Sequence, residues 1–122
     1  MKKQLGFKAY FKENNKELSM VCLGDEPCHA ASEPYVQNAD WLLSEAFCLR
    51  SEKEIFHPYE KCHSTVYDAG KQAARLGVKN LLLYHTEDSD LENRAKRYQE
   101  EAMMNFNGNI FVPCDLDVIR IL

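Results

Sequence analysis

The sequence predicts an α/β fold built on one mixed β-sheet with flanking helices. Three observations lead to this fold class. The short apolar run Leu81–Tyr84 ends in polar residues, which is typical of a buried strand. Segments with helical periodicity precede and follow it, so we expect parallel pairing through right-handed crossovers. Near the start of the chain, two apolar segments separated by a polar turn predict an antiparallel hairpin.

The first half of the chain is expected to supply three strands. Residues 4–11 alternate in polarity, and residues 18–23 form a second apolar strand after the turn. Gly24 and Pro27 end that strand, because glycine frees the backbone and proline cannot continue the ladder. Residues 28–39 are irregular or hold a short helix. A buried strand over 41–47 follows, with Glu45 near its far end.

The second half alternates helices with strands. Residues 48–62 lack periodicity and are expected to form a loop. Thr65 and Asp68 have the spacing of a capping box, so a helix should begin there and stop at Gly77. After the 81–84 strand, Ser89 is expected to cap a second helix that ends at Asn107–Gly108. Two last strands are predicted over 109–112 and 116–121.

Length and composition narrow the class of protein. The 122 residues suit one domain, 1–122, with one core. The formal charge of −4 argues against a general nucleic-acid binder. No apolar run approaches a membrane span and no signal peptide is visible, so we expect a cytoplasmic protein. The five cysteines form no CxxC pair, which indicates reduced thiols, most of them small core residues.

Polar groups follow three predicted strands, at Asp25, Glu45 and His85, and His63 precedes a helix. Parallel strands bring their C-terminal ends to one sheet edge, where α/β folds place their chemistry. Each residue also has a structural explanation: Asp25 as a turn residue, Glu45 in a salt bridge, and both histidines as satisfied polar groups. Cys62 beside His63 allows a thiol nucleophile, but local sequence reveals no group to orient it.

Four short motifs occur in order: Gly24-Asp25, the run from Ala39 to Ala46, His63-Ser64-Thr65, and Leu81-Leu82-Leu83-Tyr84-His85. Together they resemble the C-terminal half of the metallo-β-lactamase-fold hydrolases, and most closely the ribonuclease Z-like branch. The resemblance runs from about Gln4 over nearly the whole chain. The family's Gly-Asp-Thr is here Gly-Asp-Glu, and its Leu-Thr-His is Leu-Tyr-His; neither change removes a ligand.

The resemblance implies roles for three residues. Asp25 matches the metal-bridging aspartate, His85 the last histidine ligand, and His63 the histidine thought to act on the scissile phosphate. The implied metal is zinc, with manganese or iron as alternatives. The family's His-x-His-x-Asp-His motif belongs to the N-terminal half of the two-sheet sandwich, and this sequence contains no such run. The chain therefore offers an incomplete ligand set, since catalytic zinc takes about three protein ligands.

A single sheet covered on one side would expose an apolar face, formed by Leu5, Phe7 and Phe11 or by the 81–83 run. We expect a homodimer, or a partner chain carrying the N-terminal half, to cover it. The leading function is half of a metal-dependent hydrolase of RNA or another phosphodiester, inactive or weakly active alone. The alternatives are a non-catalytic binding or assembly domain, or a truncated piece of a longer enzyme.

Overall fold

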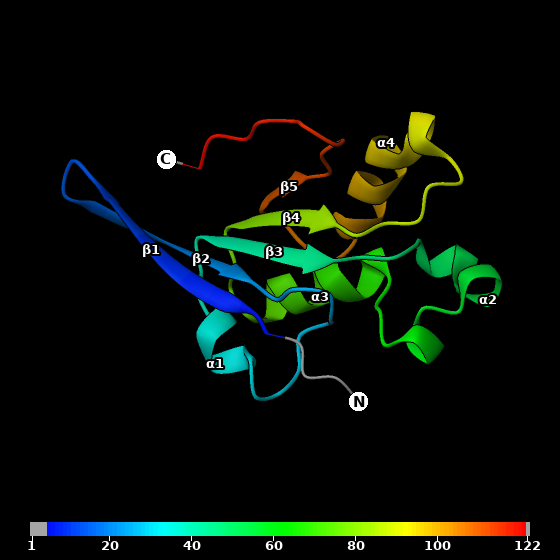
Figure 1. The fold of residues 1–122 in the computed structure, drawn as a ribbon, viewed down its shortest axis with the longest axis horizontal. Helices are drawn as coiled ribbons and strands as arrows, with labels where there is room; N and C mark the ends of the chain where they lie inside the picture. Colours follow the sequence, from blue (N-terminus) through cyan, green and yellow to red (C-terminus); the bar gives the residue numbers. More distant parts are fainter. Residues whose placement is uncertain (1–4, 122) are drawn as a thin grey trace.

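A five-stranded mixed sheet forms the centre of the structure, a computed structural model that describes residues 5–121 (Figure 1). The strands lie in space in the order of the sequence: β1 (Phe7–Glu13), β2 (Lys16–Cys22), β3 (Trp41–Glu45), β4 (Asn80–Tyr84) and β5 (Asn109–Phe111). β1 and β2 form an antiparallel hairpin, whereas β2–β3, β3–β4 and β4–β5 are parallel pairs. The predicted fold class, a mixed sheet with flanking helices, is confirmed.

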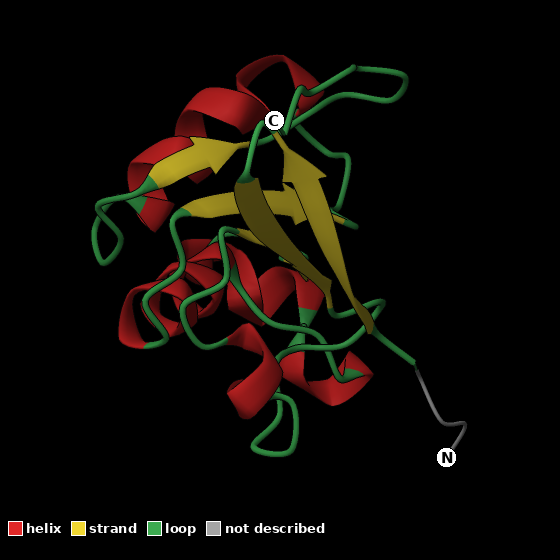
Figure 2. Cartoon of the chain, turned by 90° about the vertical axis from the view of Figure 1, so that its left-hand side faces the viewer, coloured by secondary structure: helices red, strands yellow, loops and turns green. Residues whose placement is uncertain are grey.

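The parallel strands are joined by helices that gather along one side of the sheet (Figure 2). The two longest are α3 (Val66–Arg75), between β3 and β4, and α4 (Leu91–Ala102), between β4 and β5. The shorter helical elements are α1 (Glu33–Val36), η1 (Arg50–Glu52), α2 (Lys53–Phe56) and η2 (Tyr59–Lys61). Within residues 5–121, no helix is both long enough and apolar enough to cross a membrane.

The main core lies between the sheet and the two long helices. Leu42, Leu81 and Leu83 point from β3 and β4 into this core, and each is almost fully buried. Residues of α3 and α4 cover them: Val66, Ala69, Ala73, Tyr98 and Ala102. The start of α3 follows from local sequence, because the predicted Thr65–Asp68 capping box is present in full.

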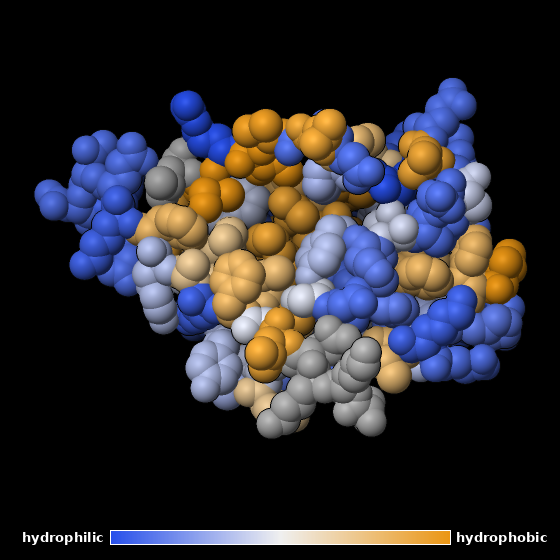
Figure 3. Space-filling view, viewed as in Figure 1, coloured by the Kyte–Doolittle hydropathy of each residue, from blue (hydrophilic) through white to orange (hydrophobic). Residues whose placement is uncertain are grey.

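The opposite face of the sheet is only partly covered. Strand register places Met20, Cys22, Leu43 and Leu82 on this face, all of them partly exposed. We call these four residues the open sheet face. The C-terminal segment shields one end of it, since the indole Nε1 of Trp41 donates to the Ile121 carbonyl at 3.2 Å. Figure 3 shows apolar atoms spread over this side of the molecule.

Some predicted positions differ from the structure. Leu81 and Leu83 belong to the core, so within the 81–83 run only Leu82 contributes to the open sheet face. Phe7 and Phe11 do lie on that side of β1, in register with Cys22 and Leu18. Leu5 precedes β1 and is exposed, and residue 4 lies outside the described residues.

Three predicted boundaries are also wrong. Residues 116–121 form no strand, because the chain turns at Asp115–Leu116 and then runs on with Leu116 99% and Val118 95% exposed. Residues 48–62 contain η1, α2 and η2 rather than a plain loop. Helix α4 begins after Asp90 rather than after Ser89, and no side chain caps its first turn.

The contact between α3 and α4 depends on Gly70. A Cβ at this position would lie 2.9 Å from the Ala102 carbonyl oxygen and 3.2 Å from the Ala102 Cα, both rigid backbone atoms. We therefore expect Gly70→Ala to lower the free energy of unfolding by about 1–3 kcal/mol, although alanine normally favours a helix. Urea unfolding followed by Trp41 fluorescence measures the change.

Ala74→Gly, on the exposed side of the same helix, is the matched control. It should cost about 1 kcal/mol through helix propensity alone. A Gly70→Ala variant as stable as the native chain would show that the two helices separate without cost.

Candidate metal centre and active site

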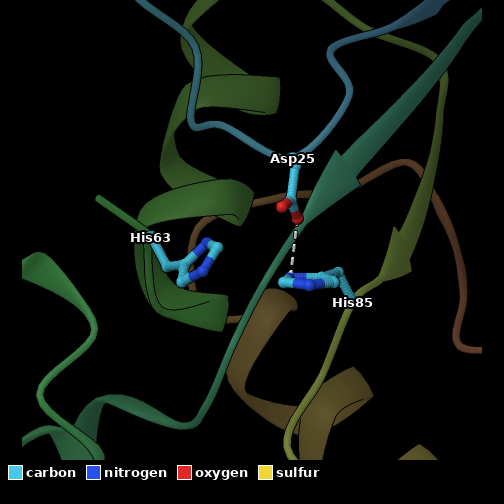
Figure 4. Close-up of side chains that lie close together, drawn as sticks. All are labelled: Asp25, His63 and His85. Carbon is cyan, nitrogen blue, oxygen red and sulfur yellow. Dashed lines mark ion pairs between the residues drawn. The ribbon is translucent and has the colours of Figure 1, made fainter. Parts of the chain in front are cut away.

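Three polar side chains from distant segments meet at the C-terminal edge of the parallel strands (Figure 4). Asp25 follows β2, His63 precedes α3, and His85 follows β4. Asp25 Oδ1 lies 2.9 Å from His85 Nδ1. One ligand atom from each of the three residues lies within 4.8 Å of the others. We call these residues the site cluster; their convergence is the one the sequence predicted.

The β2 and β4 ends are tied together behind Asp25 and His85. The hydroxyl of Tyr84 donates to the carbonyl of Gly24, so the residues before each site residue are in direct contact. Tyr84 Oη also lies 3.7 Å from Cys22 Sγ. Gly24 has a φ of 76°, which only glycine adopts without strain. This turn brings the Asp25 carboxylate to His85.

His85 itself has a left-handed backbone, with a φ of 56°. Such a conformation costs a non-glycine residue of order 1 kcal/mol and persists only where neighbouring contacts fix it. Here hydrogen bonds hold the backbone on both sides of His85. Ala46 N donates to Tyr84 O at 3.0 Å, and Glu87 N donates to Phe47 O at 2.7 Å. The turn ends β4 and directs the imidazole to the sheet edge.

His63 is positioned by the buried carboxylate of Glu45, at the end of β3. Glu45 has no exposed surface. Its Oε1 accepts hydrogen bonds from the backbone N–H and the hydroxyl of Ser64, both at 2.8 Å. Its Oε2 lies 3.4 Å from His63 Nδ1. The carboxyl group therefore joins the strand end to the segment that leads into α3.

Glu45 Oε2 and His63 Nδ1 face each other in a buried position. Among the described residues, Glu45 Oε2 and His63 Nδ1 are buried and make no hydrogen bond of standard geometry. Burial raises the pKa of Glu45 to about 7, although the hydrogen bonds from Ser64 oppose the rise. Burial also lowers the pKa of His63, and the neighbouring His85 adds to that. One proton held between the two atoms would satisfy both.

Phe47 forms an apolar wall beside both histidines. Its ring stacks on His63, with centroids 5.2 Å apart and an interplanar angle of 20°, and lies 6.4 Å from the His85 ring. Its backbone links the same segments: Phe47 N donates to Ser64 O at 2.9 Å, and its carbonyl accepts from Glu87 N and from the Tyr98 hydroxyl. Phe47 thus fixes the spacing between the two imidazoles.

Comparison with known proteins identifies relatives of this arrangement. No model of a known protein family matches the chain. The sequence is 36% identical over 97 residues to a ribonuclease Z from Ignicoccus hospitalis, covering 79% of this chain and 31% of that protein. It is 31% identical over 112 residues to a ribonuclease Z from Lactiplantibacillus plantarum, covering 92% of this chain and 35% of that protein. The chain spans about a third of the length of these curated relatives.

The structure is similar to solved metallo-β-lactamase-fold proteins. Human tRNase Z, short form, superposes with a TM-score of 0.65 at 22% identity, over 94% of this chain and 38% of that one. The metallo-β-lactamase-fold protein YhfI from Bacillus subtilis superposes with a TM-score of 0.64 at 19% identity, over 88% of this chain and 46% of that one. This chain is a ribonuclease Z-like part of a metallo-β-lactamase fold. The resemblance that the four motifs indicated is confirmed.

The sequence of this ribonuclease Z-like chain indicates the three residues of the site cluster, but not the contacts of Glu45 with Ser64 and His63. The sequence places Glu45 among the polar groups at strand ends, with a salt bridge as its structural explanation, but does not identify its partners. The structure places it under His63, fully buried and bonded to Ser64. The available signal was a carboxylate at the C-terminal end of a buried strand, at the edge where Asp25 and His85 were expected. Cys62, considered as a nucleophile, is exposed on a left-handed turn before His63.

The raised pKa of Glu45 predicts a dependence of stability on pH. The unfolded carboxyl loses its proton near its ordinary pKa of 4.5, whereas the folded one keeps it up to about 7. Between these values the unfolded state binds fewer protons, so the free energy of unfolding should fall with rising pH, by up to about 3 kcal/mol, and level off above pH 7. Glu45→Gln should remove this slope, since its amide oxygen can still accept both bonds from Ser64.

Urea unfolding at pH 5, 6, 7 and 8 measures this difference. At each pH, the free energy of unfolding of the native chain minus that of Glu45→Gln gives the contribution of the Glu45 carboxyl. Glu92→Gln, on the exposed first turn of α4, is the matched control and should leave the slope unchanged. Parallel curves for the native chain and Glu45→Gln would contradict a protonated buried carboxyl.

Proposed function

We propose that this chain supplies one side of the active site of a metal-dependent hydrolase that cleaves RNA or another phosphodiester. The observation that carries the proposal is the convergence of Asp25, His63 and His85 from three separate segments. The similarity to proteins named ribonuclease Z supports the substrate class. In this proposal Asp25 and His85 bind metal, and His63 acts on the phosphate.

The donor set fits a divalent transition metal. A carboxylate oxygen and an imidazole nitrogen suit zinc, and also manganese or iron. Asp25 Oδ1 and His85 Nδ1 already face each other at 2.9 Å, and both side chains are partly exposed and accessible to an ion. A bound metal would polarise a phosphoryl oxygen and lower the pKa of a coordinated water. With two ligands, this chain alone should bind zinc weakly.

His63 is the proton-carrying group in this proposal. Its Nδ1 faces Glu45 Oε2, which leaves Nε2 for a substrate oxygen. Contact with the buried Glu45 carboxyl holds the ring in place, and Phe47 excludes water from one face of the ring. From this position His63 can donate a hydrogen bond to a phosphate oxygen or a proton to the leaving group.

The remaining ligands must come from another polypeptide segment. The curated relatives are about three times as long as the region matched here, and this sequence has no His-x-His-x-Asp-His run. The open sheet face offers a surface for such a partner. We propose that it packs either against a segment carrying the missing ligands or against a second copy of this chain.

Isothermal titration with zinc tests the metal-binding roles. The native chain should bind about one equivalent weakly, and Asp25→Ala or His85→Ala should weaken binding at least tenfold, because each removes one of only two ligands. His63→Ala should keep most of the affinity. Asp40→Ala is the matched control, since Asp40 precedes β3 and pairs with Lys79.

Activity should appear only after mixing with a chain that carries the His-x-His-x-Asp-His half of a ribonuclease Z. Hydrolysis of bis(p-nitrophenyl) phosphate by the mixture should be lost in His63→Ala. Unchanged zinc affinity in Asp25→Ala and His85→Ala would favour the alternative, a non-catalytic assembly domain.

The open sheet face predicts self-association of the isolated chain. Light scattering after gel filtration at micromolar concentration should give the mass of a dimer, since exposed apolar residues on a sheet are stabilised by burial. Leu82→Lys should give a monomer while keeping the native circular dichroism. Leu91→Lys, at an exposed leucine of α4, should remain dimeric. A monomeric mass for the native chain would contradict the homodimer.

A further inference from the structure

A second concave site lies next to His63. It is an open pocket of about 450 Å³ between the segment after Asp25 and one flank of α3. His63 and Ser64 line the pocket, whereas Asp25 and His85 do not. His63 therefore belongs both to the site cluster and to the lining of this pocket. The volume lies in the range of small-molecule sites and can hold a nucleoside.

The inner part of the pocket is apolar and its walls are fixed. Leu42 and Ala69, both members of the core, form the floor. Tyr59 forms one wall, and its hydroxyl donates to Asp68 Oδ2 at 2.8 Å. An apolar floor beside an immobilised aromatic ring is the surface on which nucleic-acid bases stack.

The rim of the pocket carries a hydrogen-bond donor that suits the edge of a base and a cation that suits a phosphate. Gln72 Oε1 accepts from the Arg75 guanidinium at 3.0 Å, which leaves the Gln72 amide nitrogen as a donor. Arg75 is itself neutralised by Glu33. Lys71 is exposed and has no ion-pair partner among the described residues. The ammonium of Lys71 is thus the free cation at this rim, where a phosphate could pair with it.

We propose that this pocket binds the nucleotide that adjoins the scissile phosphate. The base enters against Tyr59 and Ala69, the Gln72 amide contacts its polar edge, and Lys71 pairs with the neighbouring phosphate. This inference rests on the proposed function in one respect: His63 lies beside the phosphate that is cleaved. It adds that the same histidine separates the cleaved phosphate from a base-binding pocket.

Nuclear magnetic resonance of the ¹⁵N-labelled chain, without metal, tests the pocket. Adenosine 5′-monophosphate should cause saturable shifts at Cys28, His29, Tyr59 and Gln72. Ribose 5-phosphate should bind at least about fivefold more weakly, because it lacks the base that stacks against Tyr59. Lys71→Glu should weaken adenosine 5′-monophosphate by about fivefold to tenfold, through loss of one cation and repulsion of the phosphate.

Lys96→Glu, on the exposed side of α4, is the matched control for net charge and should change the affinity little. Tyr59→Ala should weaken both the nucleotide and free adenosine. If Tyr59→Ala fails to fold, Lys71→Glu still decides the question, because its side chain lies on the surface.

Several results would overturn the inference: no saturable shifts, shifts confined to Asp25 and His85, equal binding of ribose 5-phosphate, or equal effects of Lys71→Glu and Lys96→Glu. The zinc titration separates this failure from that of the proposed function. Missing nucleotide shifts with intact zinc binding reject the pocket alone. The reverse outcome is also possible: the nucleotide shifts are retained, but Asp25→Ala and His85→Ala leave the zinc affinity unchanged. That outcome rejects the metal-binding roles of Asp25 and His85 and keeps the nucleotide pocket.

Discussion

The buried carboxyl of Glu45 is the interaction on which the site depends. It ends β3, receives two hydrogen bonds from Ser64, and faces His63. Removing a carboxyl from water is costly unless its oxygens are hydrogen-bonded, so the two donors of Ser64 are a structural requirement. The same contacts fix the entry of the chain into α3. The Glu45 carboxyl therefore contacts both the start of a core helix and a residue of the site cluster, so its loss should affect the packing of α3 and the position of His63 together.

The sheet has two unlike faces, and that difference organises the rest of the molecule. One face carries Leu42, Leu81 and Leu83 under α3 and α4, and the other leaves Met20, Leu43 and Leu82 partly exposed. The site cluster lies at the C-terminal edge between these faces. A partner seated on the open sheet face would therefore lie close to Asp25 and His85. Association and completion of a metal site would then be two results of the same contact.

Local chemistry explains which features could be predicted from the sequence. The Thr65–Asp68 capping box and the 81–84 strand depend on neighbouring residues, and both were predicted correctly. The strand predicted over 116–121 is wrong: alternating Leu116 and Val118 suit a strand, but the chain turns away from β5. The partner of Glu45 could not be predicted, because Ser64 is 19 residues away and only the folded sheet brings the two together.

The strand order has a consequence for how the chain is built. Each strand joins the sheet beside the strand made just before it, so no later strand must insert between two earlier ones. Such a sheet can grow from its first hairpin as the polypeptide leaves the ribosome. Asp25 and Glu45 would emerge and take their places first, and His85 would arrive only when β4 docks. The site cluster would therefore come together only after β4 docks, and β5 alone would be added to the sheet after it.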